Sequence, residues 1–217
     1  ERARKAIFAP LLAYIARPRQ RILRRIERFR EEHFKGKHVV GLQVRRQMRK
    51  GRDKEGAGTT DEHVEMHFKC AREAMRGAEN IVYFLATDHE PTRRTARNKL
   101  GDNLVHLNGT IDSTRGGMED AVVDLWLLGE GEQVVVTGGS TFGFVSHGRR
   151  RMKPWLVPLE KPLSSSSSDG WEKPRCEREI TCEPCFHMWP MMIAQRCFSG
   201  GFEEAMKEFG QLNCRPW

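Results

Sequence analysis

In residues 37–46, KHVVGLQVRR, a short apolar run rich in β-branched residues is followed by two adjacent arginines. The run predicts a buried strand over 37–45. Ligands of parallel α/β sheets bind outside the carboxyl ends of the strands, so we expect Arg45 and Arg46 at the ligand-binding edge. Arginine there offers a fixed fork of donors that suits phosphate. An Arg-Arg pair also occurs on solvated turns, so the rest of the chain must decide between the two interpretations.

The remaining sequence alternates between strand and helix patterns. Apolar runs predict strands over 80–86, 103–107, 133–136 and 155–157, and helical periodicity predicts helices over 3–16, 19–33, 60–76, 91–100, 118–129 and about 141–148. Pro10 and Pro18 are expected to interrupt the first two helices. Residues 59–62, TTDE, form a capping-box pattern before the third helix. The alternation predicts an α/β fold with a doubly wound, mostly parallel sheet.

Two more segments should reach the same edge of this sheet. Asp88 follows the strand at 80–86, and the loop TGGSTFG at 137–143 follows the strand at 133–136. Glycines let a backbone approach a ligand closely, and the start of a helix presents free N–H groups to an anion. Ser140 and Thr141 add hydroxyl donors. The loop lacks the Gly-Lys-Ser/Thr ending of a Walker motif, and no G-x-G-x-x-G follows the first strand, so a dinucleotide site is not supported.

Asp124 stands near the apolar face of the helix predicted at 118–129, beside Ala121, Leu125 and Leu128. A carboxylate near a buried face needs a partner. One interpretation is a structural pair with an arginine such as Arg115. The other is a ligand contact, in which the two carboxylate oxygens accept the paired N–H groups of a guanine edge.

The composition limits the partners of the chain. Its 217 residues can bury the core of one α/β domain, and the net charge of +8 fits an anionic ligand, a nucleic acid or an acidic polymer. Against nucleic acid, only 8% of residues are aromatic, they do not alternate with the arginines, and no RNA-binding motif occurs. No apolar run reaches the ~18 residues of a membrane span. The chain begins with Glu1 and shows no signal peptide, so we expect it to be a fragment.

Histidines and cysteines offer possible metal ligands. His63 and His67 lie four residues apart on a predicted helix, but no third ligand is evident, so we prefer a pair on the surface. Cys176, Cys182, Cys185 and His187 could bind zinc, although their spacing is not standard. Disulfides fit at least as well and would place the protein in an oxidising compartment. Every cysteine except Cys70 follows residue 175. These later cysteines are the disulfide candidates: Cys176, Cys182, Cys185, Cys197 and Cys214.

Four segments, in order, resemble the plant-type (xyloglucan) fucosyltransferase family. They are VGLQVRR at 40–46, FLATD at 84–88, STFGFV at 140–145 and EPCFH at 183–187, which together span roughly residues 37–190. The chain also has weaker similarity to the α-1,6- and protein-O-fucosyltransferases. The resemblance implies a GT-B fold whose second, Rossmann-like domain binds GDP-fucose.

The resemblance also implies site residues. Carried over by position, Arg45 would hold the β-phosphate and act in catalysis, and the turn at 140–142 would bind the pyrophosphate. Asp124 matches the helix position that recognises guanine in the α-1,6 relatives, in which a histidine stands at the position of Gln43. An arginine and helix N–H groups would stabilise the charge of the leaving GDP without a cation, so neither a metal nor a cofactor is expected. The donor site predicted in this way comprises Gln43, Arg45, Arg46, Asp88, Asp124, Ser140, Thr141 and Phe142.

The leading prediction is therefore a fucosyltransferase that moves fucose from GDP-fucose to a glycan hydroxyl with inversion. Such an enzyme would reside in the Golgi lumen, held by an amino-terminal membrane anchor that this sequence lacks. We expect a helical lead-in over 1–36, the nucleotide-sugar-binding domain over 37–162, and a serine-rich loop and cysteine-containing tail over 163–217. The alternatives are a nucleotide-sugar-binding pseudoenzyme and a basic nucleic-acid-binding protein.

Overall fold

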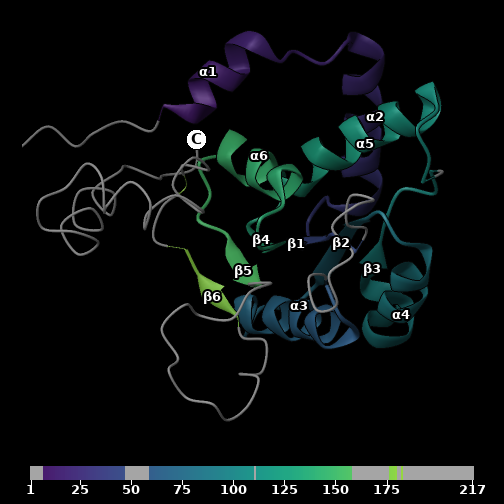
Figure 1. The fold of residues 1–217 in the computed structure, drawn as a ribbon, viewed down its shortest axis with the longest axis vertical. Coiled ribbons are helices and arrows are strands. Elements are labelled where there is room, and N and C mark those ends of the chain that lie inside the picture. The colour runs from purple at the N-terminus through teal and green to yellow at the C-terminus, as the bar shows by residue number, and fades with distance from the viewer. Residues whose placement is uncertain (1–6, 47–58, 110, 158–175, 180–181, 183–217) are drawn as a thin grey trace, which may run out of the picture.

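The computed structural model describes residues 7–46, 59–109, 111–157, 176–179 and 182 (Figure 1). The chain between Gln47 and Gly58, the serine tract at 164–170, and Cys185, His187, Cys197 and Cys214 lie outside the described residues.

A parallel sheet with one antiparallel edge strand forms the centre of the described chain. The strand order is β3-β2-β1-β4-β5-β6, and β5 and β6 are the antiparallel pair. The strands are β1 (His38–Val44), β2 (Ile81–Thr87), β3 (Leu104–Val105), β4 (Gln133–Thr137), β5 (Trp155–Val157) and β6 (Glu177–Arg178). The predicted doubly wound sheet is thus confirmed. Its strand order reverses between β1 and β4, which makes that place the topological switch point.

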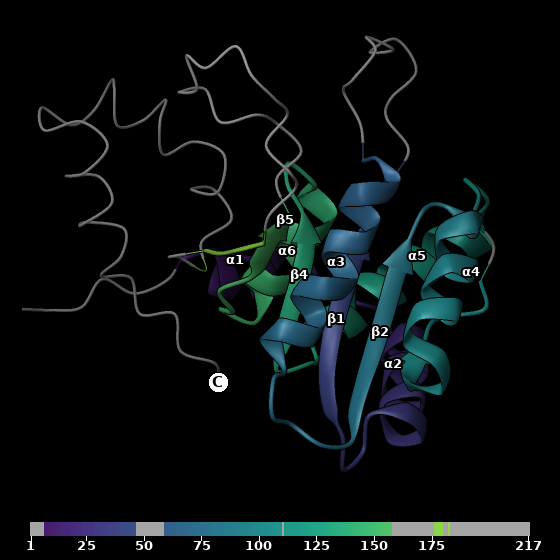
Figure 2. The ribbon, with the colours of Figure 1, turned by 90° about the horizontal axis from the view of Figure 1, so that it is seen from below.

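Helices cover both faces of the sheet. They are α1 (Phe8–Ile15), α2 (Gln20–His33), α3 (Asp61–Ala74), α4 (Glu90–Leu100), α5 (Arg115–Leu128) and α6 (Thr141–Arg149). Figures 1 and 2 show α3 and α4 on one face, and α2, α5 and α6 on the other. Pro10 lies in the first turn of α1, where no intrahelical N–H bond is lost, so the predicted interruption there is wrong. The break between α1 and α2 falls at Pro18, as expected.

The two faces of β1 explain why the strand is buried throughout. Val40, Leu42 and Val44 belong to the core cluster that contains residues of α3 and α4. Val39 faces the other way and packs with residues of α2 and α5. A Cβ on Gly41 would lie 2.5 Å from the carbonyl oxygen of Leu128, so only glycine allows β1 and α5 to approach this closely. Both layers therefore press on β1 and hold its carboxyl end in a fixed position.

The arginine-rich α2 belongs to this packed structure. Its Ile22 and Ile26 are buried against the sheet. Its Arg21 and Arg25 form ion pairs with Glu119 and Asp120 of α5. These contacts give α2 a structural role within the domain.

A disulfide joins α3 to the strand at the edge of the sheet. Cys70 and Cys176 are bonded, with their Cα atoms 5.6 Å apart, and Cys182 is disulfide-bonded as well. The disulfide prediction is confirmed for Cys176 and Cys182, and the zinc alternative is wrong for both of these cysteines. The partner Cys70 was not foreseen.

None of the helices in the described ranges combines the length and the hydrophobicity that a membrane span requires.

Candidate nucleotide-binding site

A cavity of about 500 Å³ opens at the carboxyl edge of the sheet, next to the switch point. Its wall is formed by the ends of β1 and β2, by parts of α4 and α5, by residues 107, 109 and 111–113, and by the start of α6. The structure brings together five predicted site residues here: Gln43, Arg45, Asp88, Asp124 and Phe142. Arg46, Ser140 and Thr141 do not line this cavity.

Arg45 stands at the mouth of the cavity, just after β1. Its Nη1 lies 3.1 Å from Oδ2 of Asp88, and its backbone N–H donates to Oγ1 of Thr137 over 3.0 Å. The arginine side chain is half exposed, whereas that of Asp88 is largely buried. Asp88 at the end of β2 and Thr137 at the end of β4 therefore hold Arg45 from both neighbouring strands, with its guanidinium still accessible to a ligand.

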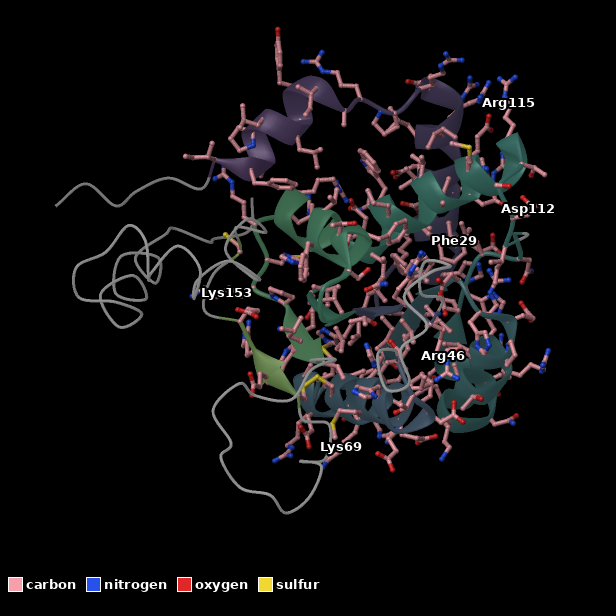
Figure 3. The ribbon with its side chains drawn as sticks, in the orientation of Figure 1. Phe29, Arg46, Lys69, Asp112, Arg115 and Lys153 are labelled. Carbon is pink, nitrogen blue, oxygen red and sulfur yellow. A yellow bond between two sulfur atoms is a disulfide. The ribbon has the colours of Figure 1, made fainter. Side chains whose placement is uncertain are left out.

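Arg46 makes a different set of contacts. Its Nη1 donates to the carbonyl oxygen of Thr59 over 2.6 Å, and its Nη2 lies 2.8 Å from Oδ1 of Asp61 (Figure 3). Its backbone N–H donates to Oδ1 of Asp88 over 2.8 Å. These bonds tie the end of β1 to the start of α3. Arg46 therefore anchors the residues that flank the segment at 47–58.

Asp124 presents a buried carboxyl group to the cavity. Its Oδ1 is inaccessible to solvent and has no hydrogen-bond partner in the part of the chain that the structure describes. Burial raises the pKa of Asp124 to about 8, with a further increase from Asp120, while Arg93 and Arg25 act in the opposite direction. Arg115 instead points to Glu119, with 3.4 Å between its Nε and Oε1 of that residue, so the predicted Arg115 partner is wrong.

Three charged residues of the cavity wall were not foreseen: Arg93, Asp112 and Asp120. Arg93 of α4 is mostly buried, and its Nη1 donates to the carbonyl oxygen of Gly109 over 3.0 Å. Asp112 accepts a hydrogen bond from the backbone N–H of Thr114, the N-cap of α5, and lies just before the start of that helix (Figure 3). The only sequence signal was the segment DSTRGG at 112–117, in which a capping Asp-x-Thr precedes two glycines.

The loop after β4 brings the start of α6 against the switch point. Ser140 is the N-cap residue, and it is buried, while Thr141 is exposed. A Cβ on Gly143 would lie 2.7 Å from Oε1 of Gln43 and 2.8 Å from Cβ of Val136, so the first turn of α6 packs directly on β1 and β4. The first N–H groups of α6 are thereby held near the cavity wall, at the positive end of the helix dipole.

The predicted surface pair of histidines is wrong for His67, which is fully buried. Its Nδ1 lies 2.6 Å from the carbonyl oxygen of His63, and its Nε2 lies 3.0 Å from Oγ1 of Thr137. Burial lowers the pKa of His67 to about 4. His63 completes the capping box of α3 with Thr60. No group of three His, Cys, Asp or Glu residues within the described ranges could hold a metal ion.

The fold and the cavity define a class of protein. A Rossmann-like sheet carries, at its switch point, an accessible arginine, a helix N-terminus and a buried carboxyl group. This is the arrangement of a nucleotide-binding domain, and it agrees with the expected second domain of a GT-B glycosyltransferase.

Comparison with known proteins shows a similarity to plant fucosyltransferases. Residues 114–195 match the family model of xyloglucan fucosyltransferases. The chain is 36% identical over 70 residues to a galactoside 2-α-L-fucosyltransferase of Arabidopsis thaliana and 35% identical over 72 residues to that of Pisum sativum. These matches cover 32% and 33% of this chain, and 12% of each relative. The resemblance to plant fucosyltransferases is therefore confirmed.

Solved structures show the same fold. Arabidopsis thaliana FUT1, solved in complex with GDP, matches with a TM-score of 0.58 and 17% identity, over 82% of this chain and 41% of that one. The NodZ α-1,6-fucosyltransferase, co-crystallised with GDP, matches with a TM-score of 0.52 and 19% identity, over 74% of this chain and 48% of that one. The chain thus spans about half the length of these structures or less, and a small part of its curated relatives.

Proposed function

We propose that the chain is the donor-binding part of a fucosyltransferase that moves fucose from GDP-fucose to a glycan hydroxyl, with inversion and without a metal ion. The observation that carries this proposal is that Arg45 and Asp124 line one cavity at the switch point of the sheet. One is an accessible cation suited to phosphate, and the other is a buried acceptor without a protein partner among the described residues.

Asp124 suits guanine because guanine presents N1–H and an exocyclic amino group side by side. In its ionised form the carboxylate of Asp124 can accept from both groups, and this would satisfy the buried Oδ1. Adenine offers no such pair of donors. Asp124 would therefore favour GDP over ADP.

Arg45 suits the other end of the donor. Fucosyl transfer leaves negative charge on GDP, and preorganised cations and helix N–H groups stabilise such charge where it develops. Arg45 and the start of α6 both lie at the carboxyl edge of the sheet. We assign the general base and the acceptor site to the part of the enzyme that this chain does not span.

The cysteines support a proposal for the location of the protein. The bonded Cys70 and Cys176 support an oxidising compartment. For a glycan-modifying enzyme we propose the Golgi lumen, with a membrane anchor outside the given sequence.

The proposal is tested by measuring the affinities of GDP, UDP, ADP and a DNA oligonucleotide for the chain and for Asp124→Asn. We expect the unchanged protein to prefer GDP, and the variant to bind GDP more weakly by ~1–3 kcal/mol with little change for ADP, because one acceptor becomes a donor facing guanine. Glu119→Gln is the matched control, since Glu119 lies on the same helix but pairs with Arg21.

Equal affinities for the three nucleotides would overturn the proposal. Fucose transfer by the full-length protein on a glycan array then tests the chemistry. GDP binding without any transfer would point to the pseudoenzyme alternative.

A further inference from the structure

A buried chain of polar groups runs from α3 to the end of β1. His67 is completely buried in α3, and Thr137, also completely buried, is the last residue of β4. Figure 2 shows α3 lying over β1 and β4. His67 Nε2 contacts Oγ1 of Thr137 at 3.0 Å, and the same oxygen accepts the backbone N–H of Arg45 at 3.0 Å.

The hydroxyl of Thr137 has two acceptors within reach, because its Oγ1 lies 3.0 Å from Nε2 of His67 and 3.1 Å from the carbonyl oxygen of Gln43. The carbonyl oxygen of His63 can only accept, so Nδ1 of His67 carries the proton. In the neutral ring Nε2 is then an acceptor, so the hydroxyl of Thr137 can donate its one proton either to Nε2 or to the carbonyl oxygen of Gln43. Burial lowers the pKa of His67 to about 4, so the ring is neutral near pH 7. Whichever of the two groups accepts this proton, Oγ1 of Thr137 keeps a lone pair for the backbone N–H of Arg45.

Thr137 also orients Gln43. Its backbone N–H donates to Oε1 of Gln43 over 3.2 Å, and Gln43 lines the cavity. Thr137 thus connects Gln43 of β1 with Arg45, which follows the strand. The side chain of His67 contacts the hydroxyl of Thr137 from the layer that contains α3.

We propose that His67 is a positioning residue for the donor phosphates: through Thr137 it fixes the main chain at Arg45 and thereby the direction of the Arg45 guanidinium. This inference rests on the proposed function. A purely structural role would be to satisfy polar groups in the core. The two roles differ in which part of a ligand they affect, because Arg45 is assigned to the phosphates and Asp124 to the base.

The test compares the affinity of GDP with that of guanosine, which carries the base but no phosphate. In His67→Phe we expect GDP binding to weaken about tenfold, as for loss of a buried hydrogen bond, and guanosine binding to stay within about twofold. His67→Gln keeps a polar atom near the position of Nε2 and should restore most of the GDP affinity. Thr137→Val should behave like His67→Phe, and the double variant should be no worse than either, because both remove the same link.

His147→Phe is the matched control. His147 is equally buried, but its Nδ1 contacts the carbonyl oxygen of Met152, away from the site. The His147→Phe substitution should lower the melting temperature and leave the ratio of GDP affinity to guanosine affinity unchanged. If His67→Phe does not fold, Thr137→Val and His67→Gln carry the same comparison.

The outcomes separate the two proposals. No preference for GDP in the unchanged protein defeats the proposed function itself. A clear GDP preference together with an unchanged GDP-to-guanosine ratio in His67→Phe and Thr137→Val removes only the positioning role of His67.

Discussion

Asp124 makes the stability of the empty domain depend on pH. Its pKa is 3.8 in the unfolded reference and about 8 in the fold, mainly because burial disfavours the charged form. Between these values the folded chain keeps a proton that the unfolded chain has lost. The folded state therefore binds more protons, and the free energy of unfolding must fall as the pH rises through this window.

We expect urea unfolding between about pH 5 and about pH 8 to show a larger loss of stability for the unchanged protein than for Asp124→Asn, whose amide does not ionise. The difference between the two proteins, rather than the slope of either, reports on Asp124. Parallel pH profiles would show that the carboxyl group is not buried in its neutral form.

Arg45 should dominate the catalytic effect of the site. Loss of a phosphate-paired arginine removes ~2–4 kcal/mol of transition-state stabilisation, so Arg45→Ala in the full-length enzyme should lose about two orders of magnitude in turnover. Arg45→Lys should rescue only part of this, because the bidentate fork is lost. Single-turnover rates with GDP-fucose provide the measurement. Near-normal transfer by a folded Arg45→Ala enzyme would remove the residue from the site.

Single residues could be predicted where the signal is local. Arg45 directly follows an apolar run, so it could be assigned to the carboxyl edge of the sheet. Asp124 has a fixed position on its helix, so it could be assigned to the neighbourhood of the apolar face. His67 and Arg93 could not be assigned in this way. Their roles depend on contacts with Thr137, 70 residues away, and Gly109, 16 residues away, which only the register between elements determines.

At the scale of elements, the contact of α6 with the sheet depends on the absence of one side chain. The first turn of α6 packs on β1 and β4 at Gly143, where a Cβ would lie 2.7 Å from Gln43 and 2.8 Å from Val136. Gly143→Ala should lower the free energy of unfolding by ~1–3 kcal/mol, as overpacking does. Chemical denaturation provides the measurement.

At Gly116, unlike at Gly143, an added methyl group has room. It lies in the first turn of α5, and the nearest atom to an added Cβ is Oγ1 of Thr114, at 3.8 Å. Gly116→Ala should therefore stabilise the protein by up to ~1 kcal/mol through helix propensity. Equal effects of the two substitutions would show that the close approach at Gly143 does not constrain α6.

The elements themselves follow largely from continuous apolar runs. The strands β1, β2, β4 and β5 lie where these runs predict them, since strands covered on both faces need apolar residues throughout. The third strand is shorter than predicted, because only Leu104 and Val105 pair with β2 before the chain turns to line the cavity. The polar β6 gave no apolar signal, since it is an exposed edge strand.

At the scale of the whole molecule, the strand order places the site. The chain builds β1, β2 and β3 in one direction and then returns past β1 to add β4 and β5. Alternation of strands and helices predicts such a sheet, and with it a ligand edge, but not which residues meet there. The cavity forms where α4 and α5 meet residues 107, 109 and 111–113, and no local sequence pattern specifies that arrangement.

The Cys70–Cys176 disulfide is the longest covalent link among the described residues, with a sequence separation of 106. A bridge that closes so long a loop restricts the unfolded chain strongly, so its loss should lower the free energy of unfolding by ~2–4 kcal/mol. Cys70→Ala, Cys176→Ala and the double variant test this by denaturation under oxidising conditions. Both single variants lose the same bridge, so the double variant should cost little more than Cys70→Ala alone.

Cys182, which is bonded separately, should remain oxidised in all three variants when peptides are mapped without reduction. Fully additive single costs would mean that each cysteine contributes only its own packing, and the bridge would then contribute nothing to stability.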